Sequence, residues 1–258
     1  MRPVLLLVLS AAAAGCAASG PVASGDARPA EEVLSFHEDG AWALSSRTVF
    51  RYGGSAGEPT EVVDQWWEDE TWANEARQVW AVDAEGRQTE GQLSTWEDGA
   101  WVLASRARFT YDEDGNKVLG VRRYVRPEAS GGVDSLVSTF DARGLETGRR
   151  FFRREGGEVV ELLRQRSEYD AGGNEVRRVH LDPQGGDWVE DRRWTYTYRP
   201  DGPRATGLVE VADTGEWTPW RREAYTYDDQ GRRLTLTADE WAEGAWVPWS
   251  RTETRYAD

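Results

Sequence analysis

The chain has 258 residues, of which 46 are acidic, 31 are basic and 14 are tryptophan, and its net charge is −15 at pH 7. Nucleic acid is excluded as a general partner, because binding phosphate backbones requires a basic footprint. His37, His180 and Cys16 are the complete set of histidines and cysteines. They form neither a zinc ligand set nor a Ser-His-Asp arrangement. The composition therefore predicts a protein that is not an enzyme and holds no metal or cofactor.

The first residues have the pattern of an export signal. Met1-Arg2-Pro3 is followed by an apolar run to Ala14, about half of the roughly 20 residues that a spanning helix needs. Residues 1–15 are therefore predicted to be a signal peptide. Residues 16–35 are rich in Ala, Ser, Gly and Pro and are predicted to form a flexible tether. Residues 36–258 are predicted to be the folded domain.

The signal ends at Ala13-Ala14-Gly15-Cys16, which resembles the lipobox of bacterial lipoproteins, with Ala13 in place of the usual Leu. The resemblance implies that Cys16 is acylated and becomes the first residue of the mature chain. Ala17, directly after it, resembles the class that is sorted to the outer membrane. The resemblance thus implies a cell-envelope protein attached to a membrane by lipid, on a periplasmic or a surface face. The alternative is ordinary cleavage nearby, with Cys16 incidental.

A period of 29 residues runs through the rest of the chain and indicates a repeat array. The most regular column is aromatic and precedes a glycine by four residues. Eight rows can be aligned on this tyrosine column, whose members are Tyr52, Val82, Tyr111, Phe140, Tyr169, Tyr198, Tyr227 and Tyr256. Ten residues earlier stands a tryptophan column, with Trp42, Trp72, Trp101, Val159, Trp188, Trp217 and Trp246. Five residues earlier stands an arginine column, with Arg47, Arg77, Arg106, Arg164, Arg193, Arg222 and Arg251.

Each row is predicted to be a β-hairpin. Residues 101–111 have the aromatic and β-branched bias of a strand, and Asp112-Glu113-Asp114-Gly115 fits a type I turn closed by glycine. A looser turn is predicted at Glu97-Asp98-Gly99. Because side chains alternate along a strand, the Trp and Tyr columns, at even offsets, are expected on one face and the Arg column on the other. The predicted fold is all-β: about 15 strands in an antiparallel up-and-down meander, coiled or partly closed.

The turns Tyr111-Asp112…Gly115-Asn116, Tyr169-Asp170…Gly173-Asn174 and Tyr227-Asp228…Gly231-Arg232 resemble the YD repeat of the Rhs and teneurin proteins. The resemblance covers roughly residues 42–258. It implies an array of hairpins. The Trp and Arg columns and the 29-residue step depart from the usual YD pattern, and the chain is too short for the large shell of that family.

The aromatic and arginine columns leave two interpretations open. Trp and Tyr columns fill a core if the sheet buries one face, whereas an exposed ladder of rings would stack on sugars. The Arg column forms cross-strand ion pairs or stacks on rings, or it binds an acidic ligand. The Trp residues outside the columns are the candidates for an exposed ligand surface: Trp66, Trp67, Trp220, Trp241 and Trp249.

These patterns predict a non-enzymatic, lipid-anchored repeat protein of the cell envelope that acts as a scaffold or as a protein-interaction surface. The alternative is a glycan-binding module that uses exposed Trp residues. The expected partners are thus the membrane, through the lipid at Cys16, and an envelope protein or a glycan.

Overall fold

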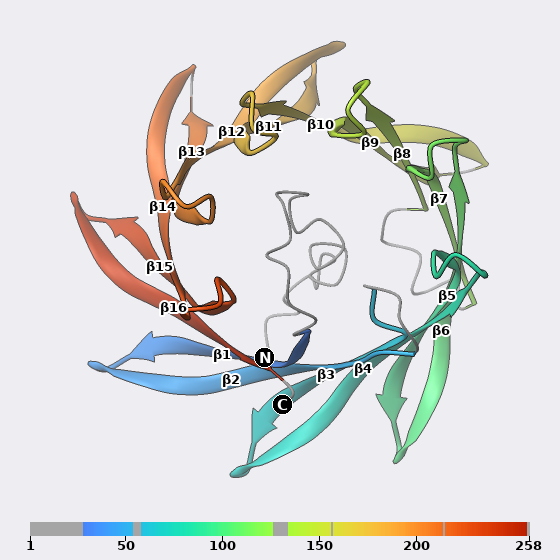
Figure 1. Cartoon of the computed structure of the whole chain (residues 1–258), viewed down its shortest axis with the longest axis horizontal. Coiled ribbons are helices and arrows are strands. Elements are labelled where there is room, and N and C mark those ends of the chain that lie inside the picture. The colour runs from blue at the N-terminus through green and yellow to red at the C-terminus, as the bar shows by residue number, and fades with distance from the viewer. Residues whose placement is uncertain (1–27, 54–57, 126–133, 156, 214, 257–258) are drawn as a thin grey trace.

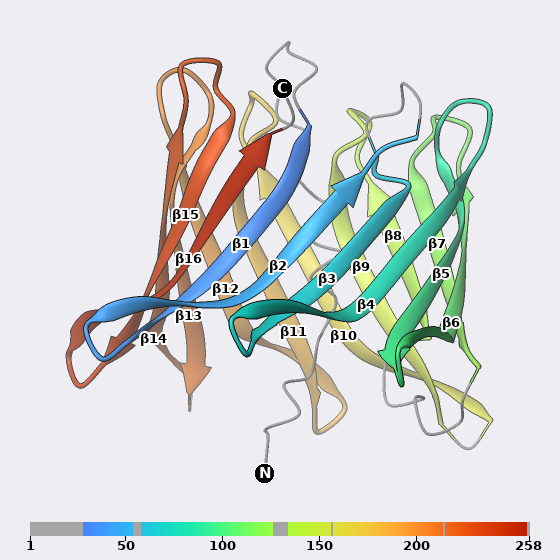
Figure 2. The same ribbon diagram turned by 90° about the horizontal axis from the view of Figure 1, so that it is seen from below.

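A computed structural model describes residues 28–53, 58–125, 134–155, 157–213 and 215–256. Sixteen antiparallel strands follow one another in sequence order around a closed barrel, which confirms the predicted all-β meander and settles its closure (Figures 1 and 2). None of the described residues lies in a helix that could cross a membrane. The strands are β1 (Pro29–Glu38), β2 (Ala41–Arg51), β3 (Glu61–Glu68), β4 (Thr71–Val82), β5 (Gln88–Glu97), β6 (Ala100–Tyr111), β7 (Lys117–Tyr124), β8 (Ser135–Phe140), β9 (Glu146–Glu155), β10 (Glu158–Tyr169), β11 (Glu175–Gln184), β12 (Asp187–Tyr198), β13 (Arg204–Asp213), β14 (Glu216–Tyr227), β15 (Arg233–Ala242) and β16 (Ala245–Tyr256).

The barrel closes through β1, which pairs with both β2 and β16. This strand was not expected, because residues 29–35 were predicted to belong to the tether. The prediction was wrong there for a physical reason. The last strand, β16, would otherwise present an edge of unpaired backbone groups, and β1 satisfies them. Residues 1–27, with the predicted signal peptide, Cys16 and most of the tether, lie outside the described residues.

The turns after the tyrosine column lie at one end of the barrel, here called the tyrosine end. In the turn at Asp112, the Gly115 amide donates to the Asp112 carbonyl at 3.1 Å and the Asp112 amide donates to the Asn116 carbonyl at 3.0 Å. The Asp112 carboxylate accepts from the Asn116 backbone amide at 2.8 Å and from its side chain at 2.9 Å. The Asn116 contacts, led by its side chain, lower the pKa of Asp112. The acidic sequence at this turn is therefore used in shaping the hairpin, as predicted.

The opposite end of the barrel, here called the tryptophan end, has tighter turns than expected. Glu97-Asp98-Gly99 forms a two-residue connection in which Asp98 has φ 48° and Gly99 has φ 81°. Two successive positive φ values define the type I′ turn, whose twist matches that of the strands it joins. The turn between β3 and β4 has the same form with two non-glycine residues, Asp69 at φ 50° and Glu70 at φ 58°.

Replacing Glu70 with glycine is expected to raise the free energy of unfolding by roughly 0.5 to 1 kcal/mol, because glycine carries no steric penalty at positive φ. Urea denaturation measures this difference. The matched control is Gly99→Ala, which should lower stability by a similar amount. An unchanged or lower midpoint for Glu70→Gly would contradict the assigned turn.

Each long strand contains one extra residue that changes the faces of the columns. The register between neighbouring strands skips one residue, seven positions before the tyrosine column. A bulge of this kind reverses the alternation of side chains beyond it. The prediction that the Trp column shares a face with the Tyr column was therefore wrong, and it lies with the Arg column instead. The extra residues are Ser45, Glu75, Ala104, Leu162, Asp191, Trp220 and Trp249.

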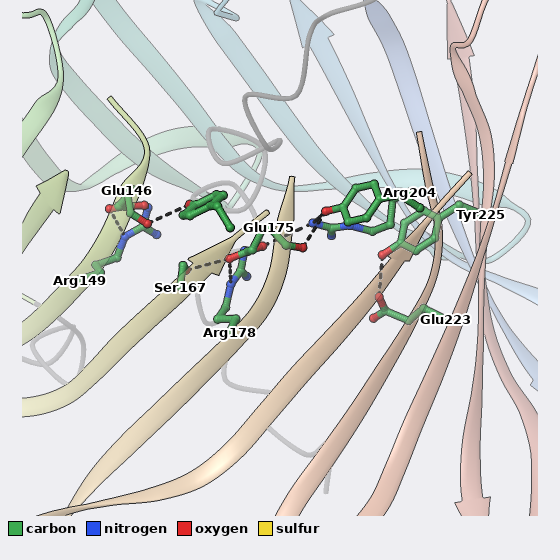
Figure 3. A network of polar contacts seen from close by, with 10 residues as sticks. Glu146, Arg149, Ser167, Glu175, Arg178, Arg204, Glu223 and Tyr225 are labelled. Carbon is green, nitrogen blue, oxygen red and sulfur yellow. Dashed lines mark hydrogen bonds and ion pairs between the residues drawn. The ribbon is translucent and has the colours of Figure 1, made fainter. Parts of the chain in front are cut away.

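The Tyr column faces the lumen, and the Trp and Arg columns face outward. Tyr225, two residues before the column residue Tyr227, lies on the lumen side of the wall (Figure 3). Fully buried side chains occur on both faces, since Val62 and Val209 share the inner face with Tyr225, whereas Val179 lies on the outer face. The stabilising contacts are thus spread over both sides of the wall, so each side must be considered as a functional surface.

Candidate functional site

The tyrosine column joins neighbouring hairpins at the tyrosine end. The hydroxyl of Tyr198 donates to the backbone carbonyl of Glu175 at 2.7 Å, 23 residues earlier in the chain. The same bond recurs at Tyr111, Tyr169, Tyr227 and Tyr256, with lengths between 2.7 and 2.9 Å. Burial raises the pKa of Tyr111 and Tyr169 to about 12, so these hydroxyls remain donors across the physiological range. These tyrosines are structural clasps.

The variant Tyr198→Phe is expected to lower the free energy of unfolding by roughly 1 to 1.5 kcal/mol, because the Glu175 carbonyl loses its side-chain donor. Chemical denaturation gives this value. Phe140 occupies the same column without a hydroxyl, so Phe140→Tyr serves as the reciprocal variant and should gain stability. A Tyr198→Phe protein as stable as the parent would show that the clasp contributes nothing.

On the inner wall next to this column, three of the strand pairs match a large side chain with a small one. In each, a large ring two residues before the column is opposite a glycine: Trp80 with Gly91, Phe109 with Gly120 and Tyr196 with Gly207. A Cβ atom on Gly91 would lie 3.2 Å from the ring of Trp80, and one on Gly207 would lie 3.3 Å from Tyr196. Where the position holds serine, arginine is opposite. The serine–arginine pairs are Ser138 with Arg149 and Ser167 with Arg178. The lumen therefore has aromatic sectors and a charged sector.

The charged sector is a network of ion pairs and hydrogen bonds on the lumen side of β9 to β14 (Figure 3). Its centre is Glu175, which is 3% exposed. The Glu175 carboxylate accepts from Ser167 Oγ at 2.8 Å, from Arg178 Nη2 at 2.7 Å and, more weakly, from Arg204 Nη2 at 3.4 Å. Glu223 similarly accepts from Tyr225 at 2.6 Å. Because these groups satisfy one another, the network is best understood as part of the wall.

His180 lies beside this network on β11. Its ring centroid is 4.5 Å from that of Trp194. Burial, together with the charges of Arg192, Arg178 and Arg149, lowers the pKa of His180 to about 4. The imidazole is therefore neutral in the folded protein near pH 7, which makes it a pH-sensitive structural element.

A ladder of alternating rings and guanidinium groups continues around the lumen from β12 to β1. Arg192 lies 4.9 Å from the ring of Trp220, and Arg221 lies 5.6 Å from both Trp220 and Trp249. Trp249 in turn contacts Phe36 on β1, with ring centroids 5.8 Å apart. Trp220 and Trp249 are bulge residues, so the ladder follows the extra residue of each strand. Sequence reasoning had placed both in an exposed surface, and the structure places them half-buried in the lumen.

On the outer face, the Arg column is stacked on the Trp column of the following row. The guanidinium of Arg164 lies 4.2 Å from the ring of Trp188, and that of Arg193 lies 4.3 Å from Trp217. The same arginines form ion pairs, as in Arg193 Nε to Glu210 at 2.6 Å. The column therefore forms both contacts that the sequence suggested, cross-strand ion pairs and cation–π stacking.

Four neighbouring hairpins also carry aromatic pairs on the outer face at the tryptophan end. In each pair the two residues are directly opposite across the hairpin, with ring centroids 4.9 to 5.2 Å apart and edge-to-face geometry. Among their members Trp42 is 41%, Trp67 36% and Trp96 37% exposed. This surface is called the aromatic belt, and its pairs are His37–Trp42, Trp67–Trp72, Trp96–Trp101 and Trp241–Trp246.

Barrel closure makes the belt continuous. Hairpin β15–β16 lies beside β1–β2, which is followed by β3–β4 and β5–β6. At the positions that correspond to Trp67 and Trp96, the hairpins β11–β12 and β13–β14 carry Pro183 and Ala212. The belt therefore occupies one side of the barrel.

Two of the five predicted surface residues, Trp67 and Trp241, belong to the belt. Trp66 is next to Trp67 on β3 and shares the inner face with Ser46, its partner on β2. Sequence reasoning missed Trp42 and Trp96. The missing signal was a pair of rings five residues apart across a turn, repeated in four hairpins.

A shallow groove continues the belt on the outer face of β2 to β6. It is lined by Trp101 and by polar side chains that include Arg47, Gln65, Asn74 and Arg77. Arg47 Nε donates to Gln65 Oε1 at 2.6 Å, and Gln65 Nε2 donates to Asn74 Oδ1 at 2.8 Å. In the described part of the chain, no three His, Cys, Asp or Glu residues are grouped as metal ligands.

No family model matches the sequence, and no curated protein matches it. Several solved structures are similar. One is a protein with unknown function from Bacteroides fragilis NCTC 9343, with 13% identity, a TM-score of 0.38 and coverage of 44% of this chain and 86% of that one. A porin-like protein from Bacteroides vulgatus ATCC 8482 has 8% identity, a TM-score of 0.39 and coverage of 90% and 99%. TcdB2-TccC3-TEV has 15% identity, a TM-score of 0.37 and coverage of 79% and 11%. Because all three TM-scores are low, functional reasoning depends on the geometry of this chain.

Proposed function

We propose that this chain is a non-enzymatic barrel of the cell envelope, anchored by a lipid on Cys16, that serves as an interaction scaffold through its aromatic belt. The belt is the observation that carries the proposal. Scattered exposed rings need no explanation, but here aromatic pairs repeat on four adjacent hairpins, with Trp42, Trp67 and Trp96 exposed, and grouped exposed apolar side chains mark interaction sites. The resemblance of Ala13-Ala14-Gly15-Cys16 to a lipobox supports the anchor and an outer-membrane location.

The lumen supports a structural role for the barrel interior. Its central carboxylate, Glu175, is occupied by Ser167, Arg178 and Arg204. Catalytic groups act on a substrate, whereas these groups bond to one another. This arrangement supports the proposed non-enzymatic role.

The charged groups on the outer face support a barrel whose wall is surrounded by water and not by lipid. A barrel wall in lipid presents an apolar band, and charges at mid-wall are costly there. Here the outer face carries the ion pairs Arg77–Glu61, Arg193–Glu210 and Arg222–Asp239. A charged outer wall agrees with attachment through a lipid on a tether, which leaves the aromatic belt accessible to a partner.

The interaction role can be tested by co-sedimentation of the purified full chain carrying Cys16→Ser with isolated cell envelopes. Binding is expected, and it should be about tenfold weaker after Trp67→Ala combined with Trp96→Ala. The matched control is Trp188→Ala with Trp217→Ala, which removes two outward tryptophans on β12 and β14, outside the belt. Equal binding by both double variants would refute the belt as the interaction surface.

Lipid attachment is tested separately by labelling with palmitate in cells. The parent chain should incorporate label and Cys16→Ser should not. A labelled Cys16→Ser protein would exclude the proposed anchor.

A further inference from the structure

We infer that the aromatic belt binds a neutral, extended polysaccharide chain that runs along the circumference of the barrel. This inference rests on the proposed interaction role of the belt and names its ligand class. Three observations carry it: the repetition of the pairs around the barrel, the exposed rings of Trp42, Trp67 and Trp96, and the charge of the groups around them.

The repetition of the pairs suits a polymer. The ladders that join neighbouring hairpins end before the pairs, at Phe36–Ser250, Ser46–Trp66 and Ala76–Thr95, and the hairpins diverge there (Figure 1). Neighbouring pairs are therefore farther apart than the roughly 10 Å of two paired strands. A single sugar cannot contact two of them, whereas an extended chain that follows the circumference can.

The edge-to-face geometry leaves ring surface available. Trp67 and Trp72 meet at 64°, and Trp96 and Trp101 meet at 69°, with one ring edge directed at the other face. Arg47 lies 4.8 Å from the ring of Trp72 and Arg222 lies 5.1 Å from that of Trp246, so these two rings are also covered by guanidinium groups. The exposed rings of the belt are those of Trp42, Trp67 and Trp96. The exposed fractions of Trp67 and Trp96 are consistent with open ring surface that a flat apolar sugar face can cover.

The rim of the belt is acidic. The turns beside the four pairs place exposed carboxylates at their tips, held there by left-handed backbone conformations. Carboxylates accept hydrogen bonds from sugar hydroxyls, and together they repel polyanions and anionic membrane surfaces. A neutral chain is therefore favoured over an acidic one. These tip residues are Asp39, Asp69, Glu70, Asp98 and Glu243.

The groove next to Trp101 adds polar side chains that supply hydrogen-bond donors and acceptors. Its amides and guanidiniums at Gln65, Asn74 and Arg77 are half-buried and lie on the same outer face as the belt. Binding sites that combine apolar platforms with a few placed polar groups are typical for small ligands and sugars. Substituent hydroxyls of the bound chain would meet these groups.

The test is affinity electrophoresis of the full chain carrying Cys16→Ser in native gels that contain hydroxyethyl cellulose, dextran or galactomannan. Retardation is expected in at least one neutral polymer, with a dissociation constant about tenfold higher for Trp67→Ala with Trp96→Ala. The Trp188→Ala with Trp217→Ala protein should match the parent.

Three results would overturn the inference. They are no retardation in any neutral polymer, stronger retardation in polygalacturonate, and equal retardation of the two double variants. Competition of the envelope binding by polylysine, without retardation by neutral glycans, would assign the belt to a basic protein segment instead. Envelope binding that depends on Trp67 and Trp96 but not on glycan would leave the proposed function standing and remove this ligand class.

Discussion

The variant Glu175→Gln is expected to lower the free energy of unfolding by about 3 to 5 kcal/mol, the usual cost of removing one partner from a buried ion pair. Glutamine has the shape of glutamate but carries no charge. Arg178, whose Nη2 is 2.7 Å from the carboxylate, would then lose its counter-charge inside the wall. Arg204 would lose the weaker contact, and Ser167 would keep a polar acceptor. Equilibrium unfolding in urea measures the loss.

The matched control for this experiment is Glu168→Gln. Glu168 is a carboxylate on the same hairpin that pairs with Arg177 at 2.7 Å, but its side chain is 59% exposed. An exposed pair contributes about 0 to 1 kcal/mol, so the control should be nearly as stable as the parent. Equal small losses for both variants would show that the lumenal network is not an integral part of the wall.

Stability is expected to fall by about 3 kcal/mol between pH 6.5 and pH 4 because of His180. Burial and the neighbouring charges of Arg192, Arg178 and Arg149 lower its pKa from the ordinary 6.5 to about 4 in the folded barrel. In this window the unfolded chain binds a proton at this residue and the folded chain does not. Acidification therefore favours unfolding, and the contribution of His180 is fully present above pH 6.5.

The contribution of His180 is isolated by comparing the parent with His180→Gln at each pH. Buried carboxyls such as Asp64 have a raised pKa and act in the opposite direction, but they do so in both proteins. The difference in unfolding free energy between the two should shrink steadily from pH 6.5 to pH 4. A difference that does not change with pH would mean that the imidazole is not held neutral.

The period of the sequence predicts most of this architecture. Turns such as the one at Asp112 have strong local chemistry, since aspartate, glycine and the preceding aromatic residue each have a defined place in a hairpin. The alternation of faces was not predictable in the same way. A single extra residue at Trp220 or Trp249 reverses the pattern, and bulges have no signature here beyond their constant position in the row.

Barrel closure also lay beyond local signals. Val33 and Leu34 on β1 follow a segment whose composition is that of a linker, and only the unpaired edge of β16 gives them a partner. The candidate site depends on this same event. The position of Trp67 outside the columns was enough to make it a candidate for a ligand surface. Its membership in a belt of four hairpins could not be predicted, because that requires β15–β16 and β1–β2 to be neighbours.

The measurement that tests the central claim most directly is disulfide formation between β1 and β16. Leu34 and Thr252 are paired across these strands, and paired residues lie within the range that a disulfide requires. The full chain carrying Cys16→Ser, Leu34→Cys and Thr252→Cys should form an intramolecular cross-link under mild oxidation. A control with Thr252 retained and Thr195→Cys on β12 should not. A missing cross-link in the first protein, or an equal one in the control, would contradict the closed barrel and with it the continuous aromatic belt.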